Sequence, residues 1–302
     1  MVSLLTLVVC LLIGVGLQRV KTLPGNAHST LGTTILYVPL PAICLLTLPD
    51  MDWNLSLISV VLVAWIVFGV AFFSVSALGK RLGWNQELIG CLMLTAGFCN
   101  TSFVGFPVIE ALYGNQALKH AVLLDQMGSF LIVSSFGVWI AVTYSSGKMR
   151  KRILFKKIFF FPPFIAFLAG ILLGAFGLRP EGDFRQVLER LAALLTPMAL
   201  ISVGLQLHWN DIHEELRYLI AGLSYKLLIA PLIILLTYSF ARVDKDILQV
   251  AVMEAGMAPM ITASILAASH NLRPRLAGMM VGVGVPLSFL TLAMWYFILK
   301  LF

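Results

Sequence analysis

Charged residues are scarce in this sequence, and their scarcity excludes most soluble proteins. Only 12% of the 302 residues are Asp, Glu, Lys or Arg, whereas 60% are apolar; a typical soluble domain has roughly 25% charged and about 45–50% apolar residues. Intrinsic disorder needs the reverse composition. The apolar runs are continuous and recur along the chain, so neither an alternating membrane β-barrel nor one anchor on a soluble domain fits. The sequence therefore predicts an all-α polytopic membrane protein.

Residues for catalysis and metal binding are also few. The four cysteines lie in apolar runs without disulfide or metal spacing, and we interpret them as packing residues. Walker loops, His-Glu-x-x-His and Gly-x-Ser-x-Gly are absent, which argues against ATP-driven transport and against an enzyme. We expect no metal and no cofactor beyond a coupling H+ or Na+. The polar stretch His208 to Glu215 lacks metal spacing and is interpreted as a solvated turn rather than a metal site.

At about 20 residues for each membrane crossing, the chain divides into ten predicted spans. Their approximate limits are 2–18, 30–49, 55–78, 87–112, 117–145, 158–178, 191–207, 218–241, 247–270 and 275–301. The first apolar run lacks a charged segment before it, so we expect it to be a retained span rather than a cleaved signal.

The basic residues predict the orientation. With the N-terminus outside, thirteen basic residues fall in inside connections and seven in outside ones, and six of the thirteen lie within 148–157. Basic residues concentrate in cytoplasmic loops, so we attribute the net charge of +7 to these loops and expect no nucleic-acid partner. The prediction is a multi-pass protein of the cell (inner or plasma) membrane with both termini outside and a cytoplasmic linker at 148–157.

The linker separates two halves, 1–147 and 158–302, of five spans each. Because five is odd, equivalent helices of the halves cross the membrane in opposite directions, as in an inverted repeat. Span four contains Asn100 to Pro107 and span nine contains Gly256 to Ser264, and both stretches combine proline, glycine and hydroxyl residues. Interrupted helices at corresponding positions of two halves are typical of secondary transporters. The alternative is an ordinary proline kink in each helix.

Several stretches carry a resemblance to a known family: Gly97 to Pro107, Ala111 to Gly114, Met257 to Pro259, Ala263 to Ala267 with His270 and Asn271, Tyr37 to Ala42, and Lys226 with Pro231. With these residues the chain resembles the auxin efflux carrier family, which includes plant PIN carriers and bacterial permeases assigned to malate, malonate and other carboxylates. The resemblance implies a fold like that of sodium/bile-acid and sodium/proton carriers, with helices four and nine crossing at the site.

The resemblance also implies a division of labour among the spans. Spans one, two, six and seven would form a scaffold, and spans three to five and eight to ten would form a transport domain that moves like an elevator. Many carriers of this family are dimers, so a homodimer is expected. Family members often have Asn near Thr262 and a second Pro near Ala258, and this chain has neither.

Nine residues make up the predicted substrate site: Asn100, Thr101, Ser102, Gly105, Pro107, Ala258, Pro259, Thr262 and Ser264. The Asn100 amide can donate to a carboxylate beside a helix break, or it caps a half-helix. The hydroxyl groups either line the same cavity or bond their own backbone carbonyls one turn back.

Three ionisable residues inside spans are candidates for ion or proton coupling, because such groups are unfavourable in lipid and usually face a cavity. Asp125 is either a relay or an interface residue beside Lys119 and His120. Lys226 either extends to the inner interface or pairs with the crossing region. Glu254 is too short to reach the surface readily, which favours a functional role.

The sequence therefore predicts a secondary active transporter that carries a small organic anion, a carboxylate, by alternating access. Its expected partners are the substrate, the lipid bilayer and a second copy of the chain. The alternative is a channel or a transporter-derived ligand sensor, which would conduct without saturation or bind without flux.

Overall fold

The computed structural model describes residues 2–20, 22–50, 57–145, 162–205 and 215–301. Every regular secondary-structure element within these ranges is a helix. The same ranges contain one isolated β-bridge, between Cys99 and Pro259. A helix satisfies its backbone polar groups internally, as a lipid environment requires. The predicted linker 148–157 and residues 208–214 of the polar stretch lie outside the described residues.

Six helical runs in the described ranges are long and apolar enough to cross a membrane: Thr30–Thr47, Leu57–Leu82, Asn115–Tyr144, Gly182–Leu205, Leu216–Phe240 and Pro274–Leu299. Shorter apolar helices occupy Val8–Leu17, Thr101–Tyr113 and Pro162–Ala175. Large apolar side chains also lie on the surface, and Phe73 and Leu290 are each 71% exposed. Such a surface is stable in lipid rather than in water. The protein is therefore a multi-pass membrane protein.

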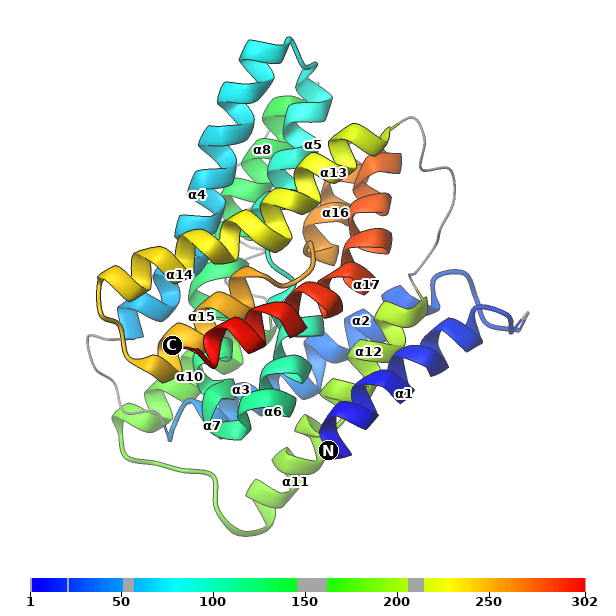
Figure 1. The fold of residues 1–302 in the computed structure, drawn as a ribbon. Coiled ribbons are helices and arrows are strands. Elements are labelled where there is room, and N and C mark those ends of the chain that lie inside the picture. Colours follow the sequence, from blue (N-terminus) through cyan, green and yellow to red (C-terminus); the bar gives the residue numbers. More distant parts are fainter. Residues whose placement is uncertain (1, 21, 51–56, 146–161, 206–214, 302) are drawn as a thin grey trace. The chain divides into compact units, whose positions relative to one another are not determined.

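The chain divides into two compact units. Unit 1 comprises Met1–Leu55, Ser102–Val122 and Phe155–Gln206. Its helices are α1 (Val2–Leu17), α2 (Ala27–Tyr37), α3 (Pro39–Thr47), α6 (Phe106–Tyr113), α7 (Asn115–Leu123), α10 (Pro162–Ala175), α11 (Gly182–Ala192) and α12 (Leu195–Leu205). Within unit 1, α12 packs against α1 and α2, and α3 packs against α10 and α11 (Figure 1).

Unit 2 comprises Ser56–Thr101, Leu123–Leu154 and Leu207–Phe302. Its helices are α4 (Leu57–Leu82), α5 (Gln86–Gly97), α8 (Val138–Tyr144), α13 (Leu216–Ser224), α14 (Ala230–Phe240), α15 (Lys245–Ala255), α16 (Ile261–Ser269) and α17 (Pro274–Leu299), with π-helical turns at Leu124–Phe130, Val133–Gly137 and Tyr225–Ile229. In this unit α5 packs against α4, α8 and α16, while α15 packs against α14, α4 and α17 (Figure 1).

Two predicted spans of unit 1 differ in detail from their expected outlines. Span two is divided at Val38, because Pro39 disfavours helical backbone in the residue before it. The helical run of span seven begins at Gly182, not near residue 191. Hydropathy alone misses this start because the sequence of α11 is polar. Arg185 and Glu189 lie one turn apart in α11 and form an ion pair of 2.9 Å, a spacing that supports a helix.

The contact between α1 and α12 depends on two glycines. A Cβ atom on Gly204 would lie 2.4 Å from the Leu11 carbonyl oxygen and 2.8 Å from the Gly14 Cα. Both neighbours are backbone atoms, which cannot move aside as a flexible side chain does. Small residues allow membrane helices to approach this closely.

We therefore expect Gly204→Ala to lower the melting temperature of the detergent-solubilised protein, by an amount equivalent to about 1–3 kcal/mol for an overpacked contact. Gly16→Ala in α1 is the matched control, because nothing lies within 4 Å of a Cβ atom there. Equal melting temperatures for the two variants would contradict the close packing of α1 and α12.

Candidate functional site

Spans four and nine are both interrupted in the structure. In span four, α5 ends at Gly97, Phe98 has extended backbone, and the helix resumes with the π-helical turn Thr101–Gly105 and α6. In span nine, α15 ends at Ala255 and α16 begins at Ile261. Gly97 lies at the break of span four, and Gly256 and Pro259 lie at the break of span nine, whereas Gly105 and Pro107 belong to the helix that resumes after the first break.

The two interruptions pair with each other inside unit 2. Cys99 and Pro259 form an antiparallel bridge. The Asn100 amide nitrogen donates to the Ala258 carbonyl oxygen at 2.9 Å, and the Met260 amide nitrogen donates to the Phe98 carbonyl oxygen at 3.2 Å. These bonds satisfy backbone groups that the broken helices leave without intrahelical partners. We call this paired region, residues 98–101 and 256–260, the crossing.

The crossing is closed to solvent and has polar side chains around it. Asn100 is 2% exposed and Thr101 is fully buried. The Thr101 hydroxyl donates to one carboxylate oxygen of Asp125, and the Gln126 amide nitrogen donates to the other at 2.6 Å. Asp125 is only 3% exposed, so it is a buried partner of the crossing and not an interface residue beside Lys119 and His120.

Lys226 approaches the crossing from the π-helical turn Tyr225–Ile229. Its side chain is fully buried, and its Nζ atom donates to the Ala255 carbonyl oxygen at 2.6 Å and to Cys99 Sγ at 3.0 Å. Ala255 is the last residue of α15. The ammonium group thus lies at the negative end of a helix dipole, where a cation is favoured. Lys226 pairs with the crossing and does not extend to the membrane surface.

Glu254 precedes Ala255 in α15 and is fully buried. Within the described part of the chain, neither of its carboxylate oxygens has a hydrogen-bond partner. Glu254 interacts electrostatically with Cys99, Asp125 and Lys226. The site therefore combines two buried acids and one buried base, and buried charges are unfavourable unless they are paired or hydrogen-bonded.

The remaining predicted substrate residues are placed as follows. Ala258 and Pro259 are buried in the crossing. The Ser264 hydroxyl donates to the backbone carbonyl oxygen of Met260, one turn back, at 3.1 Å. This is the alternative to lining the cavity that the sequence left open for this residue. Thr262 is exposed on α16. Ser102, Gly105 and Pro107 follow the crossing in sequence and belong to unit 1, with Gly105 and Pro107 buried and Ser102 half-buried.

Sequence reasoning missed two participants in this site. The sequence indicates only a packing role for Cys99, but its sulfur accepts from Lys226. The side-chain amide nitrogen of Gln126 donates to Asp125, and its side-chain oxygen has no hydrogen-bond partner in the described residues. The signal that could have found Gln126 is its position directly after Asp125, within the same polar stretch of span five.

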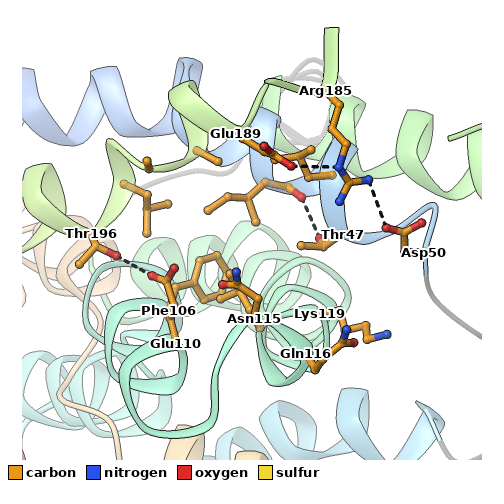
Figure 2. A pocket seen from close by; sticks show the side chains of 16 residues that line it. Thr47, Asp50, Phe106, Glu110, Asn115, Gln116, Lys119, Arg185, Glu189 and Thr196 are labelled. Carbon is orange, nitrogen blue, oxygen red and sulfur yellow. Dashed lines mark hydrogen bonds and ion pairs between the residues drawn. The ribbon is translucent and has the colours of Figure 1, made fainter. Parts of the chain in front are cut away.

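Unit 1 contains a separate cavity of about 430 Å³ that the sequence did not predict. Figure 2 shows Arg185 of α11 between Asp50, which follows α3, and Glu189. Across the cavity the Thr196 hydroxyl donates to Glu110 of α6 at 3.0 Å. The lining contains three acidic side chains, Asp50, Glu110 and Glu189, and two basic ones, Lys119 and Arg185. The cavity therefore has no net positive charge that would attract an anion. The other labelled residues of its lining are Thr47, Phe106, Asn115, Gln116 and Lys119.

Comparison with known proteins agrees with this architecture. A family model described as "Membrane transport protein", that of the auxin efflux carrier family, matches residues 1–296. The chain belongs to this family. The resemblance found in the sequence is thereby confirmed. Membership of this family indicates a role in membrane transport, and membrane transporters are generally not enzymes.

Curated relatives of this family member are similar over nearly their whole length. An "Uncharacterized transporter" of Methanothermobacter thermautotrophicus is 28% identical, and the match covers 98% of this chain and 97% of the relative. A similarly named transporter of Methanocaldococcus jannaschii is 22% identical over 97% of each chain. The "Uncharacterized transporter YfdV" of Escherichia coli K12 is 21% identical, with 99% and 97% covered. All three are similar in length to this chain and bear transporter names.

Proposed function

We propose that this family member is a secondary active transporter of small carboxylates, with the substrate held at the crossing of spans four and nine. The observation that carries the proposal is the crossing itself, where the interrupted helices are joined by backbone hydrogen bonds from Asn100 to Ala258 and from Met260 to Phe98. Next to this pairing, α16 begins at Ile261. The N-terminus of a helix offers free amide groups and a positive dipole end, which suit a carboxylate.

Asn100 is the proposed specificity-determining side chain. It lies in the break of span four and is 2% exposed, so its amide group is positioned by the paired backbone. An amide can donate to a substrate carboxylate without the strong binding that an arginine would give, which suits a carrier that must release its substrate. Thr101, Ser102, Gly105, Pro107, Ala258, Pro259, Thr262 and Ser264 complete the proposed site.

We further propose that the protein has ten spans in two inverted five-helix repeats and moves by an elevator-like mechanism. In support, spans one, two, six and seven fall in unit 1, and spans three, eight, nine and ten fall in unit 2, whereas spans four and five are divided between the units because Ser102–Val122 belongs to unit 1. We propose a scaffold from the former and a transport domain from the latter with spans four and five, a homodimeric assembly, a cell-membrane location, and both termini outside. Cysteine-accessibility labelling of both termini in intact cells tests the orientation.

The transport proposal predicts saturable carboxylate uptake that depends on Asn100. Purified protein in proteoliposomes should take up labelled malate, malonate or a monocarboxylate with saturation and counterflow, and Asn100→Ala should reduce kcat/KM by about 10–100-fold, as for one or two lost hydrogen bonds to a charged group. Asn26→Ala is the matched control, since Asn26 is exposed and its side chain makes no capping bond.

Other outcomes would identify other functions or another site. Conductance that does not saturate would indicate a channel, and a ligand-induced rise in melting temperature without flux would indicate a sensor. Saturable transport that is equal in Asn100→Ala and wild type would refute the assignment of Asn100. A melting-temperature screen of carboxylates on the detergent-solubilised wild type selects the substrates for these assays.

A further inference from the structure

Glu254 differs from the two other ionisable groups at the crossing in its surroundings. Asp125 accepts hydrogen bonds from Thr101 and Gln126, which stabilise it as an anion. Lys226 donates to the Ala255 carbonyl oxygen at the end of α15, which stabilises it as a cation. Both groups therefore have partners that suit their charged forms.

Among the described residues, the carboxyl group of Glu254 has no hydrogen-bond donor. It is fully buried, and no donor in the described residues reaches either oxygen. A buried carboxylate without hydrogen bonds is strongly disfavoured, and such a group becomes neutral by taking up a proton. The charged and titratable groups that face it are Cys99, Asp125 and Lys226. With Asp125 negative and Lys226 positive, the cluster is uncharged only when Glu254 is protonated.

We propose that Glu254 binds the coupling proton of this carrier and that the proton moves together with the carboxylate substrate; this inference rests on the function proposed above. Protonation of Glu254 removes one negative charge from the crossing. Charges within several ångströms interact strongly in a membrane interior, so the neutral form favours binding of an anion and the ionised form opposes it. Proton and carboxylate are therefore bound cooperatively and released together.

Lys226 explains why the coupling ion is a proton and not a metal cation. Its ammonium group already occupies the carbonyl oxygen at the C-terminus of α15, the position at which a helix end attracts a cation. A second cation beside Glu254 would be repelled by it.

The test uses proteoliposomes that contain the pH indicator pyranine, in sodium-free potassium buffer with labelled malate and malonate as probes. Wild-type protein should acidify the lumen as the labelled carboxylate enters. Glu254→Gln, which keeps the shape of the protonated acid, should lower the number of protons that enter for each labelled carboxylate by about tenfold or more, a ratio that a general loss of active protein would not change. Glu87→Gln, at an exposed site on α5, should behave as wild type in both assays.

The outcomes separate the two proposals. Wild-type protein that moves neither probe nor any carboxylate from the melting-temperature screen would overturn the proposed function, and this inference with it. Carboxylate uptake that requires sodium, or that proceeds without a change in lumenal pH, would overturn the inference alone. The wild-type assay needs no variant, so the inference remains testable if Glu254→Gln does not fold. Proton entry in Glu254→Gln equal to that of wild type would also refute it.

Discussion

Lys226→Met is expected to abolish carboxylate transport and to lower the melting temperature of the detergent-solubilised protein. Methionine has a similar length but no charge, so the Ala255 carbonyl oxygen loses its 2.6 Å donor and the buried cluster that also includes Glu254 and Asp125 loses a positive charge. Removing one partner from a buried set of charges typically destabilises a protein by about 3–5 kcal/mol. The measurements are melting of the purified variant and uptake in proteoliposomes.

A second substitution separates charge from packing in this prediction. In the double variant Asp125→Asn with Lys226→Met, the uncompensated anion is removed while the new amide oxygen still accepts from Thr101. The melting temperature should therefore recover most of the loss, and transport should not return. Lys80→Met, at an exposed position in the last turn of α4, is the control. If Lys226→Met transports carboxylate at the wild-type rate, the ammonium group has no part in the site.

Gly284→Val is expected to give the second largest loss of transport, because it acts directly on the crossing. A Cβ atom on Gly284 of α17 would lie 2.7 Å from Pro259 Cδ and 2.9 Å from Leu223 Cδ2. Pro259 is bridged to Cys99, so it cannot yield without disturbing the backbone pairing. Overpacking of this kind typically destabilises a protein by about 1–3 kcal/mol, and a site displaced by a fraction of an ångström binds its substrate poorly.

The experiment compares Gly284→Val with Gly278→Val in carboxylate uptake and in melting temperature. Both positions lie in α17 and suffer the same loss of helix propensity from a β-branched residue, but nothing lies within 4 Å of a Cβ atom on Gly278. We expect uptake to fall by about tenfold or more in Gly284→Val alone. A similar loss in both variants would indicate a general effect on α17 and no special role for its contact with Pro259.

The sequence by itself determined the class of protein and the positions of the helix breaks. Few charges and continuous apolar runs require lipid, a matter of composition that no packing detail can change. The breaks in spans four and nine were predictable because glycine and proline act locally on the backbone at positions such as 97, 256 and 259. Asn100, Asp125, Lys226 and Glu254 stood out for a similar reason, since polar groups are rare in apolar helices.

Only the tertiary structure decided which of these residues meet. Lys226 and Ala255 are 29 positions apart, Cys99 and Pro259 are 160 apart, and neither pairing has a signature in local sequence. Helix propensity and hydropathy describe one segment at a time, whereas hydrogen bonds between distant segments depend on how the segments pack. The same limit hid the cavity of unit 1, whose lining comes from α3, α6, α7, α11 and α12. The sequence likewise could not show that no donor in the described part of the chain reaches the Glu254 carboxyl group, because this depends on all the neighbouring residues together.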